Sequence, residues 1–226
     1  MMRTAFACAA AVAALLTAGA ASAQSTPEVA WNVGVVSDYV FRGYSQTLED
    51  PAIQGGVDAT IGAIYVGAWA SNVDFGDDTN VEVDIYGGYR GEAAGFAFDV
   101  GVVGYGYVNA PDGADYDYLE LKAAAYRAIG PATFGAAVYW SPDFFGLDEE
   151  ATYVEANAAF APAAKLTLSV AIGHQSLDVN DDYATWNVGI GYAVTEYVAI
   201  DVRYHDTDVD GPLSDGRAVA GIRFLF

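Results

Sequence analysis

The feature that most constrains the fold is a period-two pattern that recurs about twelve times between Trp31 and Phe226. In each segment of about 9 to 11 residues, apolar side chains alternate with small or polar ones, as on a β-strand with unlike faces. The last segment is an example, because Ile222 and Phe224 share one face while Arg223 lies on the other. A tilted strand of this length crosses a lipid bilayer, so the pattern predicts membrane-spanning strands.

The connections between these segments alternate between short turns and long loops. The short turns cover residues 62–63, 91–95, 128–133, 161–165 and 194–197, and the long acidic loops cover 43–51, 74–80, 108–115, 141–150, 175–182 and 206–215. Outer-membrane barrels have short periplasmic turns and longer external loops, and an even strand number leaves both termini in the periplasm. The sequence therefore predicts an all-β, transmembrane, antiparallel up-and-down β-barrel whose first and last strands pair. A soluble β-sandwich has no reason for this asymmetry.

We expect about 12 strands, and the first covers residues 31–41 with Trp31, Tyr39 and Phe41 on the lipid-facing side. The count falls to about 10 if a weakly patterned pair of strands does not cross the membrane. The segments concerned are 64–73 and 134–140.

The first 23 residues read as a secretory signal peptide that is removed from the mature protein. Arg3 gives a positive start, residues 5–18 are apolar, and residues 21–23, Ala-Ser-Ala, form a cleavage site. The apolar stretch is shorter than the roughly 20 residues of a membrane helix. Residues 24–226 then form a single exported barrel domain.

Composition excludes several other classes of protein. Cys8 is the only cysteine and lies in the leader, so disulfides, thiol catalysis and cysteine metal sites are excluded from the mature chain. Without the leader the net charge is about −22, which argues against nucleic acid as a partner. No run of 18 apolar residues follows the leader, although 54% of all residues are hydrophobic. Membrane-spanning strands reconcile these two facts.

Three runs in the first part of the chain resemble a known family. They read S-D-Y-V-F-R-G-Y-S-Q-T at 37–47, P-A-I-Q-G-G-V-D at 51–58 and G-A-W-A-S-N-V-D-F at 67–75. These runs resemble the TorF-type porins of Proteobacteria, and a weaker match continues through residues 82–89. The resemblance implies an outer-membrane pore and brings no catalytic residues and no known substrate.

Charged residues on the polar faces of the strands form the main candidate site. Charges inside a barrel line a water-filled lumen and tune its ion selectivity. The predicted lumen-lining charges are Asp38, Arg42, Asp58, Glu82, Asp84, Arg90, Asp99, Glu120, Lys122, Glu155, Asp201, Arg203 and Arg223. Acidic residues outnumber basic ones by eight to five in this set, which predicts a preference for cations. The alternative is a salt-bridged interior that only holds the barrel together.

Aromatic residues near the strand ends form a second set. Amphipathic rings are favoured at the two membrane interfaces, where they make girdles around a barrel. The predicted girdle residues are Trp31, Tyr65, Trp69, Tyr139, Trp140, Trp186, Tyr192 and Phe226. The alternative is the core of a soluble protein, in which aromatic residues would concentrate in mid-strand.

Residues 206–211 read D-T-D-V-D-G, like the opening of a calcium-binding loop. Asp206, Asp208 and Asp210 are the candidate ligands, because Ca²⁺ prefers carboxylate oxygens. However, Arg217 stands where the loop requires a bidentate glutamate. The alternative is an acidic solvated loop, and no other cofactor is expected.

An enzyme is the rival class, because some outer-membrane barrels are hydrolases. His174 and Ser176 have the His-x-Ser spacing of the outer-membrane phospholipase, in which the histidine activates a serine nucleophile. The Asn-Gly expected after the serine is instead Leu177-Asp178, and the other histidine, His205, falls on the opposite face. We therefore predict that the protein is not an enzyme.

The sequence as a whole predicts a porin-like protein in the outer membrane of a Gram-negative bacterium, with a small passive pore for ions or small solutes. The alternative is a closed structural or adhesion-type barrel that contacts lipopolysaccharide or partners through its acidic loops. Expected partners are outer-membrane lipid, lipopolysaccharide, the permeating solutes, and the barrel-assembly machinery, which would recognise the last strand ending in Phe226. The sequence does not predict an oligomeric state.

Overall fold

The computed structural model of the protein describes residues 26–178 and 181–226. The predicted signal peptide, residues 1–23, therefore lies outside the described residues. Within the described ranges, no helix is long and apolar enough to cross a membrane.

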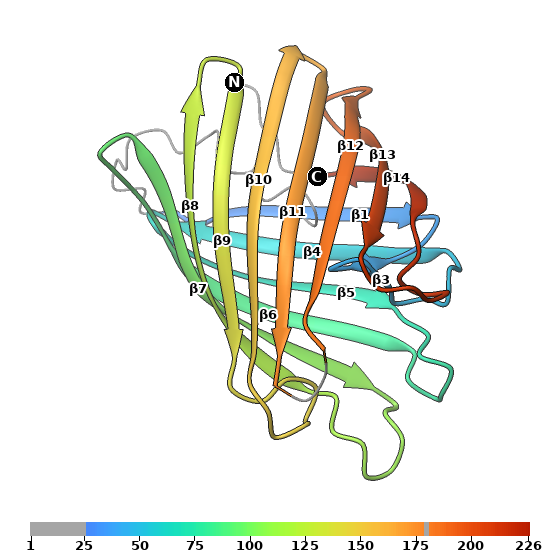
Figure 1. The fold of residues 1–226 in the computed structure, drawn as a ribbon. Coiled ribbons are helices and arrows are strands. Elements are labelled where there is room, and N and C mark those ends of the chain that lie inside the picture. Colours follow the sequence, from blue (N-terminus) through green and yellow to red (C-terminus); the bar gives the residue numbers. More distant parts are fainter. Residues whose placement is uncertain (1–25, 179–180) are drawn as a thin grey trace.

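Twelve strands of the described chain form one closed barrel, in which each strand pairs with its neighbours in sequence (Figure 1). All pairs are antiparallel, so the predicted up-and-down barrel is confirmed. The strands are β1 (Glu28–Val36), β4 (Ala52–Ile61), β5 (Ile64–Asn72), β6 (Val81–Ala93), β7 (Phe96–Val108), β8 (Tyr118–Ile129), β9 (Ala132–Ser141), β10 (Ala151–Ala163), β11 (Leu166–Leu177), β12 (Tyr183–Ala193), β13 (Val198–Thr207) and β14 (Arg217–Leu225).

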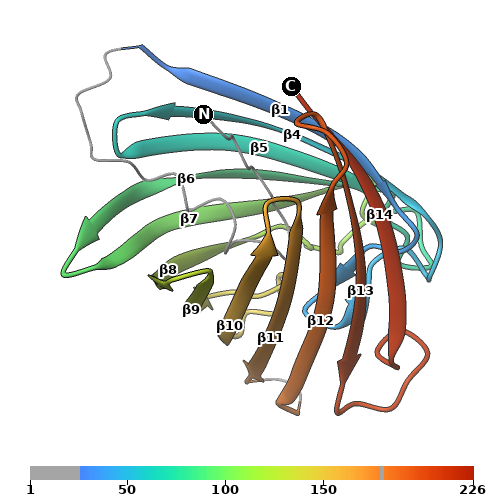
Figure 2. The same ribbon diagram turned by 90° about the horizontal axis from the view of Figure 1, so that it is seen from above.

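The first and last strands close the barrel, as predicted. Val33 of β1 lies opposite Phe224 of β14, and the register continues to the pair Val36 and Gly221. Next to this register, Trp31 of β1 and Phe226, which follows β14, exchange two backbone hydrogen bonds, with N···O distances of 3.2 and 2.9 Å. Figure 2 shows the C-terminal end beside β1. No sheet edge is left open between these two strands, which removes the unpaired backbone groups that a bilayer cannot solvate.

The two ends of the barrel differ in the length of their connections. One end carries the turns 62–63, 94–95, 130–131, 164–165 and 194–197. The other carries the segments 37–51, 73–80, 109–117, 142–150 and 208–216, together with the end of β11 and the start of β12. The predicted alternation of short turns and long loops is confirmed. Below, the two ends are called the turn end and the loop end.

The distribution of side chains is the reverse of that in a soluble protein. Large apolar residues lie on the outer face of the strands and stay exposed, as for Ile85 at 69% and Ile53 at 66%. The largest fully buried side chains are all polar, namely Gln175, Glu82, Glu120, Thr47, Thr79, Asp99, Ser141 and Ser214. An apolar exterior with a polar interior is what a barrel surrounded by lipid requires.

The first predicted strand is too long, and the loop after it does not extend outward. β1 ends at Val36, and residues 37–51 turn back into the barrel, where β2 (Val40–Phe41) pairs with β3 (Tyr44–Ser45). Figure 2 shows this blue hairpin inside the ring of strands. The lipid-facing positions predicted for Tyr39 and Phe41 are therefore wrong, as is the external position of loop 43–51.

A tight turn explains why the chain reverses at this point. Arg42 and Gly43 both have positive φ angles, of 46° and 91°. A two-residue hairpin turn of type I′ needs positive φ at both central positions, and glycine meets this requirement without strain. A Cβ atom at Gly43 would also collide with the side chains of Thr185 and Thr207, so only glycine fits where the hairpin meets the barrel wall. We call residues 37–51 the lumen hairpin.

Candidate functional site

The base of the lumen hairpin is fixed by the buried carboxylate of Asp38. Its Oδ1 atom accepts hydrogen bonds from the hydroxyls of Ser45 at 2.7 Å and Thr47 at 3.0 Å. Its Oδ2 atom pairs with the Arg217 guanidinium of β14 at 3.2 Å. Asp38 therefore ties the two arms of the hairpin to each other and to the barrel wall.

Backbone hydrogen bonds join the hairpin to two neighbouring loops. The Ser45 amide donates to the carbonyl of Leu213 at 2.8 Å, and the Asp74 amide donates to the carbonyl of Gln46 at 2.8 Å. Because these bonds come from loops on either side, the hairpin is docked at the loop end rather than suspended freely in the lumen.

The tip of the hairpin places Arg42 in the barrel interior. Its guanidinium donates two hydrogen bonds to Glu120 of β8, at 2.8 and 2.7 Å, and one to the Gln175 side chain of β11 at 2.9 Å. The side chains of Arg42 and Glu120 are only 6% and 1% exposed. Burial alone lowers the pKa of Arg42, but the Glu120 carboxylate and its hydrogen bonds outweigh this effect, so the pKa stays above its ordinary value.

Aromatic rings surround the Arg42 guanidinium. Its central carbon lies 4.4 Å from the ring centre of Tyr153, 4.7 Å from that of Phe41 and 5.2 Å from that of Tyr139. The hydroxyl of Tyr105 donates to Glu120 at 3.0 Å. A bidentate ion pair enclosed by aromatic faces is a strong and specific contact. Arg42 therefore holds the hairpin tip against β8, β9, β10 and β11.

The loops above this ion pair add more aromatic rings. Phe145 lies 5.2 Å from Tyr118, 5.3 Å from Tyr107 and 5.7 Å from Tyr116, and Phe75 lies 5.5 Å from Tyr107. These residues come from β7, β8 and three loops. Together with the hairpin tip, this loop aromatic cluster fills the lumen beside β6 to β9 at the loop end.

A second charged network lies nearer the turn end. Asp99 of β7 accepts from the Lys122 ammonium at 2.9 Å, the Arg90 guanidinium at 3.3 Å and the Tyr65 hydroxyl at 2.7 Å. Arg90 also lies over the Tyr65 ring, 4.0 Å from its centre. One carboxylate thus compensates two cations.

The wall formed by β1, β14 and β13 is different, because a cavity of about 120 Å³, lined by polar and apolar side chains, lies along it. Arg203 lines this cavity and donates to Asn187 at 2.6 Å, Ser169 at 2.9 Å and Asp201 at 3.3 Å. A Cβ atom at Gly189 would lie 2.5 Å from the Arg203 guanidinium carbon, so this glycine gives the arginine its space. The cavity reaches from Asp38 at the hairpin base down to Arg223.

The predicted lumen charges share one face of the barrel. The eleven that lie on barrel strands occupy the inner face, in phase with buried positions. Asp38 and Arg42 belong to the lumen hairpin instead of a strand, yet both are buried inside. Within the described residues, four of the acids have no basic partner, and they are Asp58, Glu82, Asp84 and Glu155. The role of these charges in ion selectivity stays a prediction.

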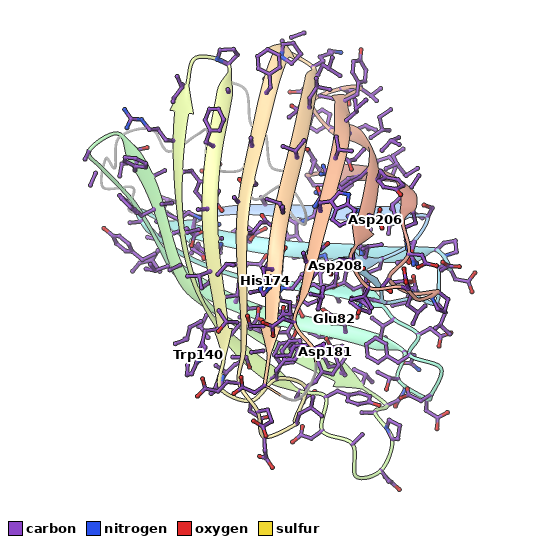
Figure 3. The ribbon with its side chains drawn as sticks, viewed as in Figure 1. Glu82, Trp140, His174, Asp181, Asp206 and Asp208 are labelled. Carbon is purple, nitrogen blue, oxygen red and sulfur yellow. The ribbon has the colours of Figure 1, made fainter. Side chains whose placement is uncertain are left out.

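The acids without basic partners are satisfied in part by tyrosine and asparagine. Tyr39 donates to Glu82 at 3.1 Å, and Tyr86 donates to Asp58 at 2.7 Å. Glu82 lies on β6 (Figure 3), two residues before Asp84. The Oδ1 atom of Asp84 is buried without a hydrogen-bond partner among the described residues.

The residues predicted for the aromatic girdle divide between the outside and the inside of the barrel, and a role at the membrane interfaces stays a prediction for those outside. Trp31, Trp186, Tyr192 and Phe226 are exposed on the outside, between 39% and 73%. Trp140 lies at the loop end of β9, and its indole N–H donates to Glu150 at 3.2 Å (Figure 3).

Three of the predicted girdle residues are inside the barrel. Tyr65 and Trp69 are 5% and 8% exposed, and Tyr139 faces Arg42. The physical reason is that Ile64 and Val66, at 61% and 56%, take the lipid-facing positions of β5. Tyr65 and Trp69 alternate with them and must point inward.

The three aspartates proposed to bind calcium do not converge. The described residues contain no group of three or more His, Cys, Asp or Glu side chains placed to hold a metal ion. Asp208 accepts from the Ala184 amide at 2.8 Å, and Asp206 accepts from the Tyr204 hydroxyl at 3.3 Å. Both lie on the loop side of β13 (Figure 3). Calcium binding by Asp206, Asp208 and Asp210 stays an untested prediction.

His174 and Ser176 lie on the outer face of β11, with 3.4 Å between Nδ1 and Oγ. Among the described residues, no carboxylate forms a hydrogen bond or ion pair with His174 to orient its ring. His205 lies inside, 8% exposed, as its strand phase predicts. The pair lacks the third group that a serine nucleophile requires.

Several interior residues were not singled out from the sequence. They are Tyr39 and Tyr105, which donate to Glu82 and Glu120, Gln175 and Tyr153, which contact Arg42, and Tyr118, which stacks on Tyr105. Strand phase was the available signal for four of them, because Tyr105, Tyr118, Tyr153 and Gln175 occupy inward positions of their strands. The period-two pattern placed Tyr39 on the lipid-facing side, because it does not show that β1 ends at Val36 and that the hairpin follows.

Comparison with known proteins gives a family and a fold. A family model described as "Bacterial protein of unknown function (Gcw_chp)" matches residues 20–223. A search of curated proteins found no significant match.

Several solved structures share the fold. The KdgM porin is 7% identical to this chain, with a TM-score of 0.61, and the match covers 89% of this chain and 99% of that one. KdgM porin in complex with disordered oligogalacturonate matches over the same shares at 7% identity, with a TM-score of 0.62. The COG4313 outer membrane channel from Pseudomonas putida F1 is 11% identical, with a TM-score of 0.55, over 92% and 97% of the two chains. At these identities the similarity is one of fold.

Proposed function

Because the chain belongs to the Gcw_chp family and folds as a porin-like barrel, we propose that it forms a narrow passive pore in the outer membrane of a Gram-negative bacterium. The polar interior and apolar exterior of the barrel are the observation that supports this proposal. Its largest fully buried side chains are polar while its outer face is apolar, so the barrel suits lipid outside and water inside. This role agrees with the TorF-type resemblance and needs no catalytic residue.

The lumen hairpin sets the width of the proposed pore. Its tip lies against β8 to β11, and the passage we propose is the cavity along β1, β14 and β13, which Asp38, Tyr39 and Val40 of the hairpin also line. A space of about 120 Å³ suits ions and small solutes.

The pore should prefer cations. Four inner acids lack a basic partner among the described residues, whereas Arg223 is the one predicted lumen base without an acidic partner there. A net negative lumen raises the local concentration of cations and lowers their barrier to passage.

The second candidate is a closed barrel that contacts lipopolysaccharide or partners through its acidic loops. The buried Arg42–Glu120 pair and the loop aromatic cluster favour it, because both close the loop end on one side. For either function, lipopolysaccharide and the barrel-assembly machinery, acting on the strand that ends in Phe226, are the partners we propose.

Planar-bilayer recordings of the refolded protein test the pore. We expect discrete current steps, and in a potassium chloride gradient a reversal potential of the sign that marks cation preference. The double variant Glu82→Gln/Asp84→Asn should reduce that preference, because it removes two acids without basic partners. Glu196→Gln, in a turn outside the lumen, is the matched control and should leave the reversal potential unchanged. Folded protein without conductance would favour the closed barrel, and anion preference would contradict the charge argument.

A further inference from the structure

The cavity along β1, β14 and β13 is lined by both polar and apolar side chains. Asn32 of β1, Gln54 of β4 and Arg223 of β14 all line it. Trp69 and Val219 add apolar surface to the same cavity. It therefore combines hydrogen-bond donors with an apolar contact surface, as small-molecule sites do.

One positive charge in this cavity lacks a counter-ion. Asp201 pairs with Arg203 at 3.3 Å, and Asp38 pairs with Arg217 at 3.2 Å. In residues 26–178 and 181–226, Arg223 has neither an ion pair nor a side-chain hydrogen bond. A guanidinium facing a partly enclosed cavity attracts an anion more strongly than one in open water.

Two side-chain amides are also available in the cavity. Gln54 is only 8% exposed, and neither Gln54 nor Asn32 makes a side-chain hydrogen bond to another described residue. The amide atoms of Gln54 are not among the buried side-chain atoms without a hydrogen-bond partner, so they face the accessible space of the cavity. Gln54 can therefore donate a hydrogen bond to a polar ligand there.

The strand register leaves room around Arg223. Its partners across the sheet are Gly34 of β1 and Ala199 of β13, and the next inward position on β14 toward the loop end is Gly221. With such small neighbours, the guanidinium is not covered by the side chains beside it. Arg203, by contrast, already uses its donors on Asn187, Ser169 and Asp201.

We infer that this cavity binds a small carboxylate anion, with the Arg223 guanidinium on the carboxylate, the amides of Gln54 and Asn32 beside it, and the apolar end toward Trp69 and Val219. The guanidinium fork matches the two oxygens of a carboxylate. A dry cavity of about 150 Å³ holds benzene, so about 120 Å³ holds a solute of about five heavy atoms. This adds one anion site to the proposed pore, at the one predicted lumen base without an acidic partner among the described residues, and its role in transport rests on the proposed function. The cation preference is assigned to the four acids without basic partners in the described chain, and none of them lines this cavity.

Ligand-observed NMR on the refolded protein in detergent micelles tests binding without any need for conductance. Propionate is the probe, and we expect saturable binding with a Kd on the order of 1 mM. Arg223→Gln should weaken it about ten-fold or more, and Arg223→Lys should weaken it less, because it keeps the charge but loses the fork. Arg127→Gln is the matched control, since Arg127 lies on the outer face of β8, over the ring of Phe96.

The outcomes of the binding measurement test the anion site independently of the pore. Equal propionate affinity in wild type and Arg223→Gln, or equal binding of the neutral propionamide, would overturn it. Sulfate that displaces propionate at lower concentration than propionate itself would overturn the carboxylate class. If Arg223→Gln does not refold, Gln54→Leu provides the second test, and unchanged affinity in that variant would overturn the inference. Binding that persists in a protein without conductance supports the site and contradicts the pore.

Discussion

Two arginines inside the same barrel have opposite surroundings. Arg42, at the tip of the lumen hairpin, has a bidentate carboxylate partner, an amide partner and three aromatic rings. Arg223, on the inner face of β14, has small neighbours across the sheet and a cavity in front of it. Arg42 joins the hairpin to the barrel wall, whereas Arg223 remains available to a solute in the lumen.

The two arginines illustrate the difference between charges that stabilise the fold and charges that remain available to a solute. A buried guanidinium that is fully paired has little left to offer a permeating ion, because its field is cancelled by its carboxylate. A guanidinium without a counter-ion keeps its positive field and acts on any ion that enters the lumen. The same rule divides the acids, since Glu120 and Asp99 are paired with bases whereas Glu82 and Asp84 are not.

The largest effect is expected from Arg42→Ala, which removes the arginine that joins the hairpin to the barrel wall. It leaves Glu120 buried without a counter-charge, and such a loss costs about 3–5 kcal/mol. The hairpin should leave the wall, so that single-channel conductance rises by about two-fold or more as the lumen widens. Planar-bilayer conductance and urea unfolding of the refolded protein measure the two effects.

The double variant Arg42→Ala/Glu120→Gln is the control for this prediction. Removing the charge from both partners should recover part of the lost stability, while the hairpin stays detached. Conductance unchanged in both variants would show that the hairpin does not limit the passage.

The sequence predicted the barrel wall well and the hairpin poorly, for different physical reasons. Strand phase is local, so it placed Glu82 and Asp99 on the inner face without knowledge of any partner. The hairpin depends on a positive φ at Arg42 and on a contact with Glu120, 78 residues away. A period-two pattern predicts neither of these features. The errors at Tyr65 and Trp69 came from the amphipathic rings, which suit an interface and a polar lumen equally well.

A smaller effect is expected from Asp99→Asn, which leaves two bases without a carboxylate partner, as Arg223 already is within the described residues. Lys122 and Arg90 lose their shared carboxylate, whose side chain is 3% exposed. The lumen becomes less negative, so the reversal potential should move toward anion preference. The free energy of unfolding should fall by about 1–3 kcal/mol, because Arg90 is partly exposed and water screens its charge.

Asp99→Glu is the matched variant, since it keeps the charge and changes only its reach. It should retain the wild-type reversal potential. A reversal potential that moves equally in Asp99→Asn and Asp99→Glu would point to a change in barrel shape rather than in charge.

The smallest effect is expected from Glu49→Gln at the outer side of the hairpin. Arg217 contacts two carboxylates at 3.2 Å each, but Asp38 is 7% exposed whereas Glu49 is 58% exposed. An exposed ion pair contributes less than about 1 kcal/mol, because water screens it and its side chains lose freedom. Urea unfolding should therefore show a change below about 1 kcal/mol for Glu49→Gln and a larger loss for Asp38→Asn, which also loses acceptor strength toward Ser45 and Thr47. Equal losses in the two variants would mean that the hairpin is held from its exposed rim, and that the buried contacts of Asp38 and Arg42 are not its main attachment.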